Sequence, residues 1–101
     1  MEMPTSRSYR SYLIESLKDT QEAAAYLDAV LEDGSFEEVR LALTNVAEAQ
    51  ISILEDTQLV SHRREIYETL SQQNQLDFST LLKILSELGF RISIAPRRKA
   101  A

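Results

Sequence analysis

The chain has 101 residues, of which 44% are hydrophobic and 27% are charged, and its formal net charge is −5 at pH 7. This length and composition predict one small globular domain rather than a disordered chain. The sequence has no cysteine, which excludes disulfides, zinc–thiolate sites and thiol nucleophiles. It also has no long apolar run and no secretory signal, so we expect a cytoplasmic protein without a membrane span.

The two halves of the chain differ in charge. Residues 1–57 include twelve acidic and four basic residues, whereas residues 58–101 include four acidic and seven basic residues. An acidic front and a basic back predict two faces that bind different partners. The alternative explanation is that solvated helix faces simply differ in charge.

The first part of the chain predicts an arm followed by two helices. Residues 1–8 lack periodicity and are expected to form a flexible arm, after which apolar residues at helical spacing predict a short helix over residues 9–17. Asp19 is placed to cap a second helix, with the Glu22 side chain reaching back to the cap. Gly34 is placed to end this helix in a left-handed conformation.

Three further helices are predicted in the middle of the chain. The capping box Ser35–Glu38 opens the first of them. A second box, Ser52–Glu55, predicts a helix that ends near residues 59–60. Ser61 is then placed to cap a third, which runs over residues 62–72.

The end of the chain predicts a sixth helix and a short strand. Asp77 can cap this helix and Gly89 can end it. Apolar and polar residues then alternate over residues 90–95, and a period of two predicts a strand with one buried face. Because a lone strand cannot satisfy its backbone groups, we expect it to pair with the same strand of a second chain. Residues 97–101 are expected to form a basic, disordered tail.

Catalysis is not expected. His62 is the one histidine of the sequence, and its neighbour Ser61 points about 100° away on a helix, so the two cannot form a nucleophile–base pair. The acidic pairs are explained by placement near helix N-termini or on solvated faces. The sequence has no glycine-rich phosphate loop and no metal-ligand spacing, so we predict neither a cofactor nor a metal site.

The predicted junction near residues 59–61 is the best candidate for a binding site. Its second helix begins with two arginines and a histidine, and a recognition helix reads DNA with its N-terminal residues. Arginine can form two hydrogen bonds to a guanine edge, and a serine cap can bond a phosphate oxygen. The predicted DNA contacts are Ser61, His62, Arg63 and Arg64, with added phosphate contacts from Arg91, Arg97, Arg98 and Lys99.

Four segments of the sequence resemble the addiction-module antidote (antitoxin) family: Tyr12–Asp19, Glu22–Gly34, Ile66–Ser71 and Phe78–Ile94. The resemblance covers residues 9–96. It implies an all-α, five- to six-helix, XRE/lambda-repressor-like helix-turn-helix domain of the HigA-like type, here with a short C-terminal strand. It also implies a homodimer that binds a RelE/ParE-like toxin and represses its own operon at an operator.

The acidic helices over residues 9–33 are the predicted surface for a basic toxin, with contacts from Tyr9, Tyr12, Leu13, Leu17 and Tyr26. The middle of the chain departs from the family pattern, because its motif turn has no glycine. In addition, Glu55 and Asp56 would repel phosphates. The alternative is therefore a protein-interaction module with a degenerate helix-turn-helix that does not bind DNA.

Overall fold

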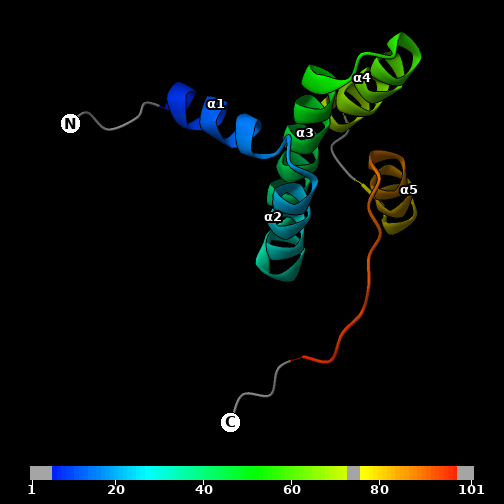
Figure 1. Ribbon diagram of the computed structural model, residues 1–101. Helices are drawn as coiled ribbons and strands as arrows, with labels where there is room; N and C mark the ends of the chain where they lie inside the picture. Colours follow the sequence, from blue (N-terminus) through cyan, green and yellow to red (C-terminus); the bar gives the residue numbers. More distant parts are fainter. Residues whose placement is uncertain (1–5, 73–75, 98–101) are drawn as a thin grey trace, which may run out of the picture.

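The computed structural model describes residues 6–72 and 76–97 of the chain, and over these ranges all regular secondary structure is helical (Figure 1). An all-α fold is therefore confirmed. The five helices are α1 (Ser6–Ser16), α2 (Thr20–Asp33), α3 (Phe36–Ile53), α4 (Thr57–Gln72) and α5 (Phe78–Leu88). The helix α1 begins inside the predicted arm, of which residues 1–5 lie outside the described part.

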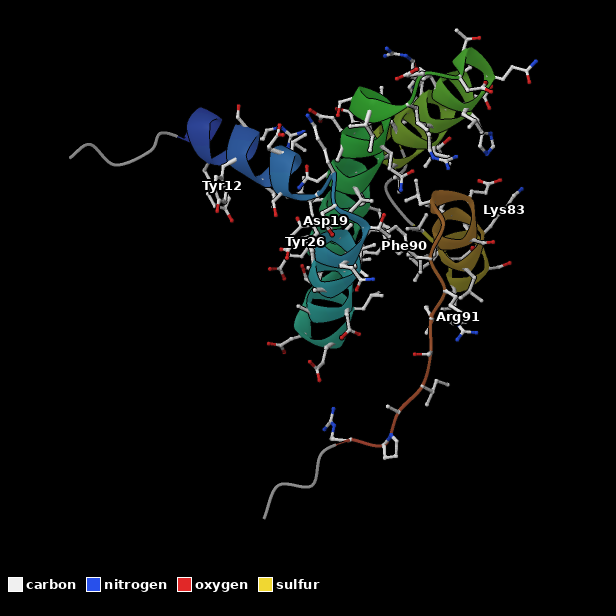
Figure 2. All side chains as sticks on the ribbon, viewed as in Figure 1. Tyr12, Asp19, Tyr26, Lys83, Phe90 and Arg91 are labelled. Atoms are coloured by element: carbon white, nitrogen blue, oxygen red, sulfur yellow. The ribbon has the colours of Figure 1, made fainter. Side chains whose placement is uncertain are left out.

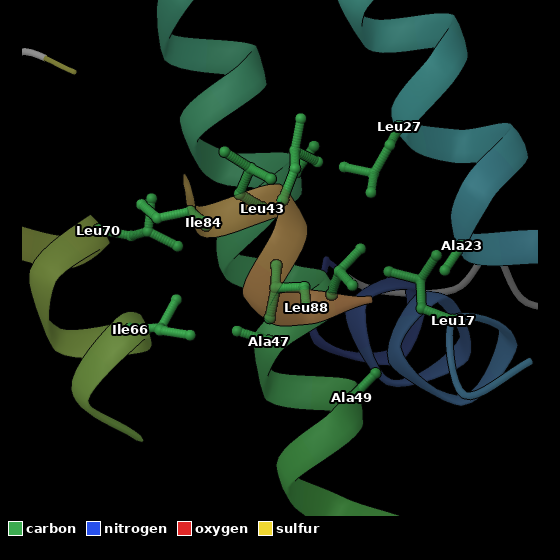
Figure 3. Packing of buried hydrophobic residues seen from close by; sticks show 13 residues of the cluster. Leu17, Ala23, Leu27, Leu43, Ala47, Ala49, Ile66, Leu70, Ile84 and Leu88 are labelled. Carbon is green, nitrogen blue, oxygen red and sulfur yellow. The ribbon is translucent and has the colours of Figure 1, made fainter. Parts of the chain in front are cut away.

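The helix α3 lies at the centre of the fold and packs against each of the other four helices. Six of its residues are buried: Ala42, Leu43, Asn45, Val46, Ala47 and Ala49. Because three of these are alanines, neighbouring helices can come close to the α3 backbone. The other buried hydrophobic residues surround this face (Figure 3): Leu17, Ala23, Leu27, Ile66, Leu70, Ile84, Leu85 and Leu88.

The helix α2 is capped by Asp19 as predicted, but the Glu22 side chain does not reach back to the cap, because the Asp19 N–H donates to the Ser16 carbonyl (3.2 Å). The Asp19 carboxylate accepts hydrogen bonds from the backbone N–H groups of Gln21 (2.8 Å) and Glu22 (3.1 Å), which confirms the cap. Gly34 does end α2, but in an extended conformation, with φ −87°, so the predicted left-handed conformation is wrong. Glycine is needed here for space, because a Cβ atom would lie 2.6 Å from the Val30 carbonyl oxygen.

The caps of α3 and α5 are confirmed. In the Ser35–Glu38 box, the Ser35 N–H donates to the Glu38 carboxylate (2.7 Å) and the Glu38 N–H donates to the Ser35 hydroxyl (3.2 Å). The bond from the Ser35 backbone, and then the Ser35 hydroxyl, lower the pKa of Glu38. The stability that these bonds add is present above the ordinary pKa of 4.5 and is lost as the pH falls through the lower folded-state pKa.

The α5 helix is closed at both ends by local hydrogen bonds. Asp77 accepts from the Thr80 N–H (2.8 Å). The Thr80 hydroxyl, and then this N–H, lower the pKa of Asp77. Gly89 adopts the predicted left-handed conformation, with φ +97°. The Phe90 N–H then donates to the Leu85 carbonyl (2.8 Å), which completes a Schellman motif.

The largest difference from the sequence prediction lies between α3 and α4. The predicted cap Ser52 lies inside α3, where its hydroxyl donates to the Ala49 carbonyl (2.6 Å). Asp56 caps α4 instead, because its carboxylate accepts from the N–H groups of Gln58 (2.8 Å) and Leu59 (3.2 Å). Ser61 therefore lies within one continuous helix. The prediction of two short helices that meet at residues 59–61 is wrong. No glycine or proline interrupts α4.

The structure assigns no strand to residues 90–97 of the single chain. Phe90 packs against the core, whereas every residue from Arg91 to Arg97 is exposed. The predicted strand requires a second chain to supply backbone partners, so it stays a prediction.

Asp56→Ala should lower the free energy of unfolding by about 1 kcal/mol, because it removes the carboxylate that caps α4. Asp56→Asn keeps a capping oxygen and should stay within about 0.3 kcal/mol of the parent. Urea unfolding followed by circular dichroism measures both. A loss for Ser61→Ala that exceeds the loss for Asp56→Ala would restore the prediction of two short helices.

Leu43→Ala should destabilise the protein by about 3 kcal/mol, because Leu43 is only 1% exposed at the contact of α3 with its neighbours. Leu41→Ala is the matched control on the same helix. Leu41 is 55% exposed, so its truncation should cost about 0.5 kcal/mol or less. Equal losses for the two variants in chemical unfolding would contradict the central position of α3.

Candidate functional site

The helix α1 projects from the rest of the domain and is anchored along one side only (Figure 1). Leu17, just after α1, is buried, and Leu13 and Ile14 pack against the core. Tyr9 and Tyr12 face away from the core and are 61% and 75% exposed. A projecting helix with two exposed tyrosines offers aromatic contact area to a partner, since tyrosine is enriched among the residues that dominate binding energy.

A polar network holds α1 against α2 and α3. Arg10 of α1 donates to the Asn45 side-chain oxygen (2.7 Å) and forms an ion pair with Glu48. The Asn45 amide in turn donates to the Tyr26 hydroxyl of α2 (3.1 Å). Because Asn45 is only 2% exposed, its two bonds satisfy a side chain that would otherwise be buried without partners. This network fixes the position of α1.

Of the predicted toxin contacts, Tyr9 and Tyr12 therefore lie on the surface, and Leu17 lies in the core. Leu13 and Tyr26 are half-buried, and the Tyr26 hydroxyl already accepts a bond from Asn45. Figure 2 shows Tyr12 beneath α1, on the side toward which α2 extends. The α2 sequence contains acidic but no basic residues, and its exposed carboxylates are Glu22, Asp28, Glu32 and Asp33.

Two of the predicted DNA contacts are engaged by the chain itself. Arg63 donates from Nε to the side-chain oxygen of Gln50 on α3 (2.6 Å). His62 lies over α5, with its Nε2 3.4 Å from a carboxylate oxygen of Glu87. These two neighbours thus point toward different helices, as the 100° step of an α-helix requires.

The other two predicted DNA contacts, Ser61 and Arg64, are exposed. Arg64 lines a surface groove together with Glu48, Tyr67 and Glu68. Two carboxylates beside a guanidinium reduce its attraction for a phosphate. The four residues therefore do not form one continuous cationic surface.

The three-residue turn between α3 and α4 consists of Leu54, Glu55 and Asp56. If α3 and α4 bound DNA, the first turn of α4 would contact the bases, because recognition helices use their N-terminal residues. Glu55 and Asp56 are exposed there. Carboxylates stabilise a helix N-terminus but repel the DNA backbone.

Sequence reasoning missed the structural roles of Asn45 and Gln50. Gln50 accepts from Arg63 and donates to the Leu88 carbonyl (2.8 Å), so it joins α3 to α4 and to the end of α5. A signal was available for Asn45, because it shares a helix face with the apolar residues Ala42 and Ala49, three positions before it and four after it. Nothing in the sequence identifies the distant partners of either residue.

The described residues hold no cluster of three or more side chains that could bind a metal ion. Within the same part of the chain, no helix has the length and apolarity needed to cross a bilayer.

Comparison with known proteins identifies the family. Residues 9–96 match the family described as probable addiction module antidote protein. The chain belongs to this family. No curated protein and no solved structure matches it. Membership in an antidote family supports an antitoxin role with a toxin as partner, and such a role needs a binding surface rather than a catalytic centre.

In this antidote protein, Arg10→Met should loosen α1, because it removes the bond to Asn45 and the ion pair with Glu48. Backbone amides of α1 should exchange hydrogen faster, while those of α5 should not change. Lys18→Met, which removes only an exposed pair with Glu15, is the control and should leave α1 protected. Unchanged α1 protection in Arg10→Met would show that the network does not hold the helix.

Proposed function

We propose that the chain is the antitoxin of a type II toxin–antitoxin module, which neutralises a RelE/ParE-like toxin and represses its own operon. The observation that carries the toxin half is the projection of α1, with its exposed Tyr9 and Tyr12, next to the acidic helix α2.

The chemistry of the α1–α2 surface fits a basic toxin. Its carboxylates would attract a cationic partner over distances near the Debye length and speed association. Tyr9 and Tyr12 would then supply buried contact area, which decides how slowly the complex dissociates. Leu13 and Tyr26 would contribute from the edge of this surface, where both are half-buried.

The DNA half of the proposal rests on α4. Ser61 and Arg64 keep exposed side chains that can reach a phosphate and a base edge. His62 and Arg63 would join them after giving up the contact of His62 with Glu87 and the hydrogen bond of Arg63 to Gln50. Pairing of residues 90–95 between two chains would give the homodimer expected of a repressor that binds a two-fold operator.

A second candidate function has its own support. The bond from Arg63 to Gln50 and the exposed pair Glu55 and Asp56 favour a protein-interaction module whose helix-turn-helix no longer binds DNA. Binding of the purified protein to its own upstream DNA at a series of salt concentrations separates the two. Specific binding supports repression, and no binding even at low salt supports the interaction module.

Tyr12→Ala should weaken toxin binding by about 30-fold, the loss typical of an aromatic residue that dominates an interface. Phe78→Ala is the matched control, because Phe78 is also an exposed aromatic residue, 65% exposed on α5. Isothermal titration against the RelE/ParE-like toxins of the same genome measures both. If Phe78→Ala weakens binding and Tyr12→Ala does not, the toxin binds elsewhere than α1; if no toxin binds, the toxin half of the proposal fails.

A further inference from the structure

Over residues 9–72 and 76–97, whose side chains the structure describes, the basic side chains fall into two groups. Four of them form a hydrogen bond or ion pair inside the chain: Arg10, Lys18, Arg40 and Arg63. The other four have no such bond within the described part: Arg64, Lys83, Arg91 and Arg97.

The unengaged cations differ in their surroundings. Arg64 shares its groove with Glu48 and Glu68, and Lys83 shares a groove between α4 and α5 with Glu65 and Glu87. Arg91 and Arg97 instead follow Glu87, which is the last acidic residue of the sequence. Their segment, residues 91–97, is named here the basic arm. It is exposed along its whole length and runs away from the helices (Figure 1).

The base of the basic arm packs on the core, whereas the arm itself is exposed to solvent. The left-handed Gly89 and the packing of Phe90 on the core set the point at which the arm leaves α5. Pro96 has no N–H group, so strand pairing over residues 90–95 would end before Arg97. In such a strand Arg91 would lie on the face opposite Phe90, which packs on the core. Both arginines therefore remain available whether or not two chains pair.

We propose that the basic arm binds the DNA phosphate backbone and supplies two of the contacts that make DNA binding salt-dependent. This inference rests on the DNA-binding half of the proposed function. The six residue steps from Arg91 to Arg97 reach about 20 Å when extended. Duplex DNA presents a charge about every 1.7 Å of its axis, so both guanidinium groups find phosphates without a fixed register. A guanidinium group can also donate two parallel hydrogen bonds to the oxygens of one phosphate.

The test uses the full chain, a duplex of its own upstream DNA and a scrambled duplex of equal length. Fluorescence anisotropy across about 50–200 mM KCl gives the slope of log K against log salt concentration. The double variant R91Q/R97Q should reduce this slope by about 1.8 for each bound chain, because each lost phosphate contact removes about 0.9. The reduction should be equal on both duplexes, so the preference for the upstream DNA is retained.

Arg64→Gln is the matched control, because it removes one exposed guanidinium from α4 instead of the arm. An unchanged slope in R91Q/R97Q together with a reduced slope in Arg64→Gln would overturn the role of the arm and keep DNA binding on α4. If the parent protein binds neither duplex, the role of the arm and DNA binding through α4 are both overturned. Titration with toxin would still test the antitoxin role separately. A further outcome is that the chain self-associates in a salt-sensitive way that R91Q/R97Q abolishes, while the slope of DNA binding against salt stays unchanged. That result would show that the arm binds the acidic α2 of a second copy, and it would also overturn the proposal.

Discussion

The burial of α3 among the other four helices is the constraint on which the rest of the structure depends. A helix covered on several sides must present small or apolar side chains to its neighbours, and any polar group it buries must be bonded. Asn45 and Gln50 meet this requirement by bonding to residues of other helices. The bonds of Asn45 and Gln50 therefore also position α1, α2, α4 and the end of α5 around α3.

Because the middle of α3 is buried, the candidate surfaces for partners lie on the elements around it. The projecting helix α1 offers Tyr9 and Tyr12, and α2 offers exposed carboxylates. The helix α4 offers the exposed Ser61 and Arg64, and the basic arm offers Arg91 and Arg97. The charge asymmetry between the two halves of the sequence thus falls on different elements of the fold, which fits one protein partner and one anionic partner.

The parts of the fold that depend on local chemistry follow from the sequence, because a cap is formed by residues within one turn of each other. Asp19, Asp77 and Gly89 are of this kind. The start of α4 could not be predicted in this way, because Ser52 and Asp56 both offer a capping oxygen. The packing of α3 selects between them. In the candidate site, Tyr9 and Tyr12 are exposed, and their predicted toxin contacts stay a prediction. The burial of Leu17 and the bond of Arg63 to Gln50 depend on contacts distant in the sequence, because Gln50 lies thirteen residues before Arg63.

The central claim is that the α1–α2 surface receives the toxin, and backbone amide shifts of the isotope-labelled chain, recorded while unlabelled toxin is added, test it most directly. The chain is 11.5 kDa, so every described helix can be followed in one experiment. The account predicts that the largest changes fall in residues 9–33, with small changes in α4 and α5. Changes confined to α4, α5 or the basic arm, with α1 and α2 unaffected, would contradict it.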